Sequence, residues 1–158
     1  MAAYGLLTMY NLTASIGTQK SGEAPSVTWT YSPLLAGIDN IAEALNETVQ
    51  QYFFMADAGY ARNHVTAMAP AFTLTGRRIM GDPAQEFIFG AKYGLDTGRQ
   101  SSFQLEYTNA EGKKVTATCD CTICNIQEWS GATSDDSAIS FELRFDGKPK
   151  VTTTPAVK

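Results

Sequence analysis

The segment from Phe103 to Cys119, FQLEYTNAEGKKVTATC, decides the fold class. Apolar and polar residues alternate on both sides of its centre, and a period of two is typical of a strand with one buried face. The central residues Asn109–Gly112 favour a short hairpin loop, because Asn and Gly adopt the backbone conformations that tight turns require. The segment therefore predicts two antiparallel strands joined by a hairpin.

The same alternation extends on both sides of this hairpin. It continues as far as Ile123 and recurs in Phe72–Thr75 and Ile139–Asp146. Val27–Tyr31 predicts a further strand, which Pro33 would end because Pro cannot donate to a β-ladder. Polar composition predicts loops in two segments, Thr18–Pro25 and Ser130–Ser137. Together these patterns predict a mainly β protein.

One α-helix is clearly signalled. Asp82 is a good N-cap, Pro83 suits the first helical position, and Gly94 or Gly98 is the expected end. Apolar residues recur at helical spacing after this start, at Phe87, Ile88, Ala91 and Leu95. We expect the helix to pack these residues across one face of the sheet, with Phe87, Ile88 and Ala91 making the contact.

The sequence pattern gives less information on the secondary structure of two other segments. Apolar residues between Ile38 and Phe53 fit helical spacing, yet Thr48–Met55 is also rich in β-forming residues, so periodicity alone leaves both structures open. Residues 147–158 contain two prolines and a run of threonines, which predicts an extended C-terminal tail without a core of its own. The remaining residues 1–146 are the length of one domain.

Composition limits the classes of function. The net charge of −4 and the pI near 4.9 argue against tight nucleic-acid binding, which needs a concentrated Lys/Arg surface. The charged fraction of 18% is below the typical value of about 25%, which suggests that a partner covers part of the surface. No apolar run approaches the roughly 20 residues that span a bilayer, so we expect no membrane partner.

Chemistry-bearing residues are sparse. His64 is the sole histidine and is expected in a polar loop, and the adjacent Asp135 and Asp136 are expected in a solvated one. Cys119, Cys121 and Cys124 have spacing that a zinc ion could use, but a structural site needs a fourth ligand. Buried reduced thiols on a strand explain them better. The sequence predicts neither an enzyme nor a cofactor.

Four short motifs in one order carry a resemblance. They are Asp57-Ala58-Gly59-Tyr60, His64-Val65-Thr66, Gly76-Arg77-Arg78 and the stretch Gly81–Ile88, which begins Gly-Asp-Pro-Ala-Gln-Glu. This part of the chain, from Thr48 to Asp146, resembles the tail tube (major tail) proteins of tailed bacteriophages. In that family a glycine-containing turn follows an aromatic strand, a second strand ends in Gly-x-Arg, and a helix opens with Gly-Asp-x-Ala-Gln.

The resemblance implies a small β-sandwich or partial barrel with one flanking α-helix. It implies a structural subunit of hexameric rings that stack into a tube, through which viral DNA leaves during ejection. The implied partners are copies of the chain itself, a tape-measure protein, a tail terminator and baseplate or tail-tip proteins, with DNA passing only transiently. The implied location is the virion tail, after assembly in the host cytoplasm.

The resemblance also favours particular structures in the first half. Val49–Met55 should be a strand, residues 34–47 a projecting loop that contacts neighbouring subunits, and residues 1–25 an N-terminal arm. Apolar residues in irregular segments are candidates for contacts between subunits: Leu6, Leu7, Met9, Tyr10, Leu34, Leu35, Ile38 and Ile41. The alternative for each of them is that it completes the core of its own subunit.

The net negative charge suggests an acidic bore that repels phosphates. Glu106, Glu142 and Asp146, on the polar faces of the predicted strands, are the candidates to line it. Two other functions fit the same β domain. One is a monomeric or low-oligomer β-sandwich binding module, and the other is the hexameric tube component of a bacterial secretion system.

Overall fold

The computed structural model describes residues 4–23 and 25–155. The remaining positions of the expected N-terminal arm and C-terminal tail lie outside the described residues. The described chain contains the following elements: β1 (Thr13–Ser21), β2 (Thr28–Pro33), β3 (Ile38–Ala44), β4 (Thr48–Phe53), β5 (Ala61–Ala67), β6 (Ala71–Arg77), α1 (Pro83–Gly90), β7 (Gln100–Thr108), β8 (Lys114–Gln127), β9 (Ala138–Phe145), β10 (Lys150–Thr154) and the 3-10 turns η1 (Met9–Asn11), η2 (Met55–Asp57) and η3 (Asp96–Arg99).

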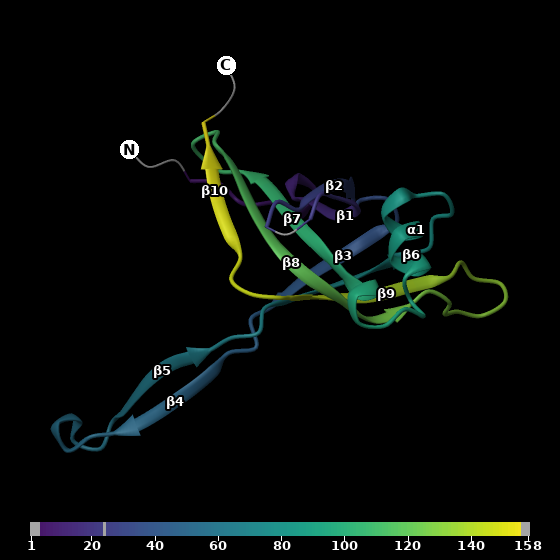
Figure 1. Cartoon of the computed structure of the whole chain (residues 1–158). Coiled ribbons are helices and arrows are strands. Elements are labelled where there is room, and N and C mark those ends of the chain that lie inside the picture. The colour runs from purple at the N-terminus through teal and green to yellow at the C-terminus, as the bar shows by residue number, and fades with distance from the viewer. Residues whose placement is uncertain (1–3, 24, 156–158) are drawn as a thin grey trace.

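Eight of these strands form one antiparallel sheet (Figure 1). Its order is β2-β1-β7-β8-β9-β6-β3, and β10 pairs with β8 beyond the end of β9. The two outermost strands of this order, β2 and β3, are consecutive in the chain and are joined by Leu34–Gly37 alone. This crossover from Pro33 to Ile38 reaches at most about 18 Å, whereas the edges of a flat seven-strand sheet lie about 29 Å apart. The sheet must therefore curve into a partial barrel.

The core lies on the concave face of this sheet, and the predicted alternation accounts for it. Phe103 pairs with Cys119 and Leu74 with Phe141 across neighbouring strands, so the apolar positions of each strand fall on one face. A single buried cluster results: Ala14, Ile16, Leu34, Phe72, Leu74, Ala84, Ile88, Phe89, Phe103, Cys121, Ile123, Ile139, Phe141 and Leu143. The expectation of a mainly β fold with one flanking helix is confirmed.

Helix α1 begins where the sequence predicts and ends early. The Asp82 carboxylate accepts a hydrogen bond from the Gln85 backbone N–H at 3.2 Å, which caps the helix. The helix ends at Gly90 rather than at Gly94 or Gly98. The Arg99 guanidinium donates to the carbonyl oxygens of Lys92 and Gly94, so the chain turns there instead of continuing its helical ladder. Leu95 consequently lies outside the helix and is exposed.

Gln85 ties the helix to the crossover. Its buried side-chain amide donates to the carbonyl oxygens of Ala36 (2.9 Å) and Arg77 (3.1 Å), and its Oε1 accepts from the backbone N–H of Ile79 (2.8 Å). The resembled helix motif thus has a structural role here. All these partners are backbone groups, which need hydrogen bonds once buried.

Two glycines let the crossover lie against β6. A Cβ built on Gly76 would sit 1.9 Å from the Gly37 carbonyl oxygen, and Gly37 has a φ of +73°. The Arg77 backbone N–H donates to that same oxygen at 2.7 Å. A side chain at Gly76 would therefore push β3 away from β6.

Three sequence predictions are wrong. Thr18–Ser21 belongs to β1 and pairs with β2, and its polarity reflects the exposed end of a strand rather than a loop. Residues 34–47 do not project as a loop, because Ile38–Ala44 is the edge strand β3 paired to β6. His64 lies in strand β5 and not in a polar loop. In each case exposure of both strand faces removes the alternation that would mark a strand.

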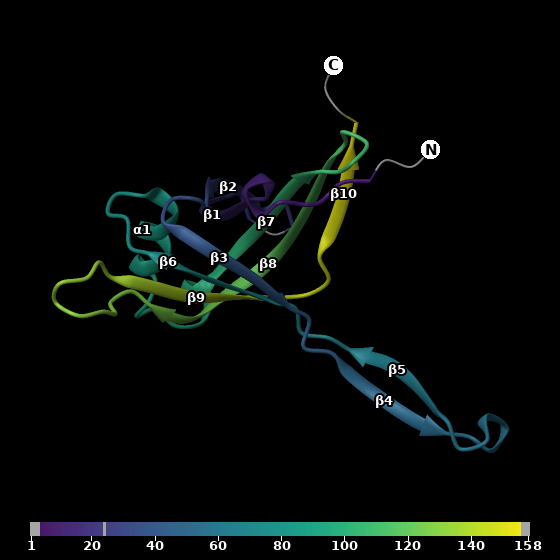
Figure 2. The ribbon, with the colours of Figure 1, turned by 180° about the vertical axis from the view of Figure 1, so that it is seen from behind.

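The element that does project is the β4–β5 hairpin (Figures 1 and 2). In both views it extends away from the barrel on the side opposite α1. The resemblance favours a strand over Val49–Met55, and the strand is present but ends at Phe53, because Met55 begins the 3-10 turn η2. We call residues 48–67 the projecting hairpin. None of them is buried, and Asp57 alone among them is half-buried.

We expect Gln85→Ala to lower the free energy of unfolding by about 3 kcal/mol or more. The substitution leaves the Ala36 and Arg77 carbonyl oxygens and the Ile79 N–H buried without partners, and each unsatisfied group costs about 1–3 kcal/mol. Urea unfolding measures the change. The exposed Gln50→Ala is the matched control and should shift stability by less than about 0.5 kcal/mol. Equal stabilities for the two variants would contradict this role of Gln85.

Candidate assembly surfaces

The projecting hairpin has hydrogen bonds at its base and its tip, and none of its residues belongs to the barrel's core cluster. Where it leaves the barrel, the Ala69 backbone N–H donates to the Leu45 carbonyl oxygen at 2.9 Å. At its tip, the Arg62 guanidinium donates two hydrogen bonds to the Asp57 carboxylate, at 2.7 and 2.9 Å. Bidentate pairs of this kind fix geometry as well as charge. The hairpin is therefore held at both ends.

Cross-strand register divides the hairpin's side chains between two faces. Val49 pairs with Val65 and Phe53 with Ala61, and we name their side the valine face, which also holds Gln51 and Asn63. The opposite side is the tyrosine face, listed by residue as Gln50, Tyr52, Phe54, Arg62 and His64. Tyr52 stacks on Phe54 with ring centroids 5.8 Å apart and meets His64 edge-on at 5.9 Å.

Large apolar side chains are exposed along this hairpin. Phe53 is 65% exposed, Tyr60 78% and Met55 fully exposed, and Val49, Tyr52, Phe54 and Val65 are also exposed. A two-stranded hairpin is marginally stable by itself in water, and a contiguous exposed apolar patch usually marks an interaction site. The resemblance favours the strand, but the sequence analysis did not single out these exposed side chains. The available signal was the run Gln51–Met55, QYFFM, which carries no charge.

The sheet offers unpaired strand edges as well. Among the described strands of the eight-stranded sheet, β2, β3 and β10 each pair on one side alone. Beside the edge of β3 lies a groove of about 510 Å³ lined by Met9, Tyr10, Leu35, Ile38 and Ile41 among others. Open edges attract further strands unless they are covered. Six of the residues expected to contact neighbouring subunits line this groove, since Leu34 lies at its floor.

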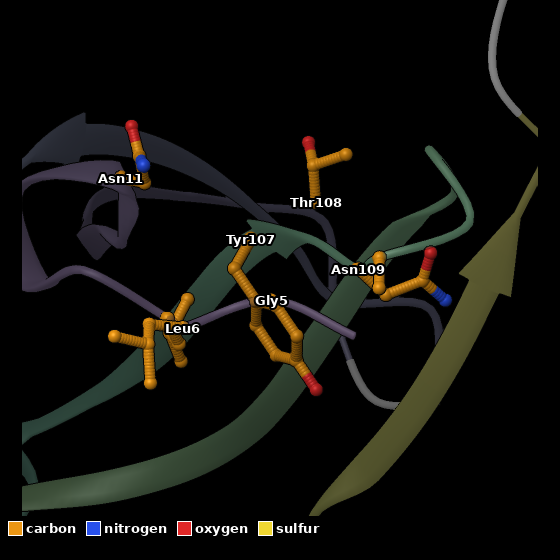
Figure 3. Close-up of a pocket in the computed structure, with 8 residues that line it drawn as sticks. Gly5, Leu6, Asn11, Tyr107, Thr108 and Asn109 are labelled. Carbon is orange, nitrogen blue, oxygen red and sulfur yellow. The ribbon is translucent and has the colours of Figure 1, made fainter. Parts of the chain in front are cut away.

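The other two expected contact residues, Leu6 and Leu7, lie outside this groove. Leu6 is 97% exposed and lies with Leu7 beside Tyr107, in a hollow of about 520 Å³ at the β7–β8 turn. Figure 3 shows Tyr107 against the segment that carries Gly5 and Leu6. Leu34 touches the groove beside β3 but is 1% exposed and part of the core cluster, so it is a core residue of its own subunit. The crossover carries it inward to fill the barrel.

The three helix residues expected to pack on the sheet differ in how far they are buried. Ile88 is fully buried, whereas Phe87 and Ala91 are half-buried. Ala84 and Phe89, which the sequence analysis did not single out, make up the rest of the buried apolar face. The helix is only two turns long, so its buried side consists of Ala84, Gln85, Ile88 and Phe89 and does not extend to Leu95.

The convex face of the sheet, opposite the core, carries the three predicted acidic residues. Glu106 forms an ion pair with Lys114 at 2.8 Å, and Glu142 forms one with Arg144 at 2.8 Å. The Thr122 hydroxyl donates to the Asp146 carboxylate at 2.6 Å. The Arg144 hydrogen bond, with help from Asn125, lowers the pKa of Glu142. The face is therefore acidic yet partly neutralised by its own cations.

A network of three half-buried charged residues and the exposed Glu86 joins α1 to the ends of β6 and β8. Arg78 contacts Glu86 at 2.8 Å and Glu128 at 3.2 Å, and Lys92 contacts Glu128 at 2.6 Å. Burial acts to raise the pKa of Glu128, but the hydrogen bonds from Lys92 and Arg78 outweigh it and the pKa is lowered. Both named residues of the Gly-x-Arg motif therefore have structural roles. Gly76 lets the crossover lie against β6, and Arg78 forms ion pairs with Glu86 and Glu128.

The cysteines behave as small apolar residues. Cys119 and Cys121 are buried on the core side of β8, and Cys124 is half-buried. Burial, with Asp120 and Asp146 nearby, raises the pKa of Cys119, and burial raises that of Cys121 strongly. Across residues 4–23 and 25–155, no three His, Cys, Asp or Glu side chains converge on a point that could hold a metal ion. Among those residues no helix is long and apolar enough to cross a bilayer.

Comparison with known proteins shows which structures share this fold. No protein-family profile matches the sequence, and no curated protein matches it. Solved structures do match. The SPP1 tail tube aligns with a TM-score of 0.66 at 15% identity, covering 97% of this chain and 81% of that one. The tail of an empty gene transfer agent particle, refined with C6 symmetry, aligns with a TM-score of 0.60 at 12% identity, covering 93% of this chain and 99% of that one.

A third match is the tube-terminating cap of the anti-feeding prophage, with a TM-score of 0.57 at 14% identity, covering 98% of this chain and 95% of that one. At these identities the likeness establishes the fold. The chain has the fold of phage tail tube structures, which confirms the resemblance that the motifs indicate. Its structural neighbours are components of tails and tubes.

We expect the ion network to make stability depend on pH. The pKa of Glu128 is lower in the folded state than its ordinary value of 4.5, so its contribution is complete above that value and is lost as pH falls through the folded pKa. Glu128→Gln should cost about 1–3 kcal/mol at pH 7 and much less at pH 3, measured by urea unfolding. Glu47→Gln, at an exposed position, is the control. A cost for Glu128→Gln that is the same at both pH values would refute the linkage.

We expect Cys119 and Cys121 to resist thiol reagents in the folded protein. Their raised pKa values and burial keep them protonated and covered, so a disulfide reagent at pH 8 should modify at most Cys124 until guanidinium unfolds the chain. Counting released thiolate by absorbance gives the number. Fast modification of all three thiols, or one zinc ion per purified chain by mass spectrometry, would contradict this assignment.

Proposed function

We propose that this chain is a structural subunit of a phage tail tube, assembling into hexameric rings that stack around a lumen through which viral DNA passes during ejection. The observation that carries the proposal is the projecting hairpin. Twenty residues extend from a tail-tube fold, expose aromatic and aliphatic side chains, and add nothing to the barrel's core. Such an element makes sense only in contact with another molecule.

Lateral contacts would come from the sheet edges. A strand edge that meets a different edge on the next copy forms a head-to-tail interface, and such interfaces close into a ring when the rotation allows. The groove beside β3 adds apolar area to that contact. The C6 symmetry of the gene transfer agent tail supports six copies per ring. Stacking contacts would then fall to the projecting hairpin, which points away from the barrel.

The convex polar face is our candidate for the lumen wall. It is the sheet face that α1 does not cover, and Glu106, Glu142 and Asp146 lie on it. Carboxylates there repel phosphates, while Lys114 and Arg144 are occupied by ion pairs and so offer DNA few free cations. The surface would let DNA pass without binding it.

The tube role places the chain in the virion tail, after assembly in the host cytoplasm. It would assemble there around a tape-measure protein, with a tail terminator at one end and baseplate or tail-tip proteins at the other. The role is mechanical and not enzymatic. The match to a tube-terminating cap favours one alternative, a single ring that ends a tube. A secretion-system tube would use the same contacts and would be distinguished by its gene neighbours.

We expect the purified chain to form rings and tubes at rising concentration by electron microscopy. Replacing residues 47–68 with two glycines should abolish tubes while leaving the melting temperature within a few degrees, because none of the residues 48–67 is buried and Leu45 and Ala69 already pair at the base. A variant that still forms tubes would contradict the stacking role of the hairpin. Single rings from the wild type would favour the terminating cap, and strictly monomeric particles would favour a binding module.

A further inference from the structure

The cross-strand register of the projecting hairpin leaves both of its faces uncovered. Val49, Phe53 and Val65 project to the valine face, whereas Tyr52 and Phe54 project to the tyrosine face. All five side chains are between 44% and 65% exposed. A hairpin that rests on a surface is apolar on one side and polar on the other. Here large apolar side chains are exposed on both sides, next to Gln51 and Asn63 on the valine face and next to Gln50, Arg62 and His64 on the tyrosine face.

We infer that the hairpin of each subunit is held between two other copies of the chain, one covering the valine face and the other the tyrosine face. This inference rests on the proposed tube assembly and specifies its geometry. A single flat partner surface covers one face of a two-stranded ribbon and leaves the other in water. Covering both faces requires either two partners or one partner with a deep slot.

The distribution of charge favours copies of the same chain as the partners. Within residues 48–67 the charged side chains are Asp57 and Arg62, which neutralise each other at the tip. The rest of the chain carries the whole net charge of −4. Two acidic bodies repel when they approach closely, and a neutral apolar segment between them separates their charges while burying apolar area. The hairpin has the composition that contact between two acidic copies requires.

The chain also supplies apolar hollows of its own. At the open end of the barrel a pocket of about 190 Å³ is lined by Phe72, Phe103, Leu105, Phe145 and Val151 with others. The rings of Phe72, Phe103 and Phe145 lie 5.1 to 6.0 Å from one another. The groove beside β3 is a second hollow. Protruding and hollow apolar surfaces on the same chain favour open-ended self-assembly over a closed pair.

Little ordering is needed for the hairpin to be inserted. Arg62 and Asp57 hold the tip, the Gln51 amide donates to the Asn63 side-chain oxygen at 3.2 Å across the valine face, and Tyr52 already stacks on Phe54. A segment that is ordered before binding loses less conformational entropy on binding. Contacts on both faces can therefore add to affinity with little opposing cost.

Photo-crosslinking counts the partners directly. Gln50 and Gln51 are adjacent, exposed residues on opposite faces, so each can be replaced with p-benzoylphenylalanine singly and both together. Each variant is mixed at one part in twenty with differently tagged wild-type chain, assembled into tubes and irradiated. Each single variant should give dimers with wild type. The double variant should add a trimer that contains two wild-type chains.

Dimers alone from the double variant would overturn the inference, because they would show one partner covering both faces. A substitution in the β7–β8 turn, Glu111→p-benzoylphenylalanine, controls for random collision. Hydroxyl-radical labelling of wild-type tubes gives a second measurement that needs no variant. Labelling of Val49 and Phe53 and of Tyr52 and Phe54 should fall several-fold on assembly, and protection of only one pair would also refute the inference. Absence of tubes would reject the proposed function, and the inference with it.

Discussion

The crossover of four residues between the edge strands β2 and β3 is the constraint on which the rest of the structure depends. It forces the sheet to curve, and the curvature creates the concave core and the convex polar face together. Gln85 and the glycine pair Gly37 and Gly76 hold the crossover against β6. The helix motif on which the resemblance rests has a structural explanation here, since its Gln85 side chain satisfies the backbone groups that the close approach buries.

Pattern in the sequence was enough to predict the elements that form this core. The alternation of apolar and polar residues predicts β6, β7, β8 and β9, which are strands with one buried face. Capping residues predict the start of α1. The alternation fails where both faces of a strand are exposed. Polarity predicts a loop at the end of β1, and β3, with Asp39, Asn40 and Glu43 in an edge position, shows no alternation, so that the resemblance alone suggests a projecting loop there. Periodicity reports burial in the subunit's own core, so strands with little such burial carry no period.

The candidate contact surfaces were predictable only in part, for a related reason. An apolar residue in an irregular segment can face a partner or the core, and nothing in its neighbours along the chain distinguishes the two. Leu34 faces the core and Leu35, its neighbour, does not. The hairpin aromatics were visible in the sequence as a β-prone run, yet their exposure follows from where β3 and β6 end. That position is a property of topology and not of local composition.

The connection between hairpin and barrel has a mechanical consequence. Two short strand-free segments, residues 45–47 and 68–70, carry every covalent link between them, and a backbone hydrogen bond and the Asn46 side chain hold their base. In a stacked tube such joints would be softer than the continuous barrel on either side. Bending would then concentrate between rings and leave the bore of each ring round, so that a long tail could flex without closing on its contents.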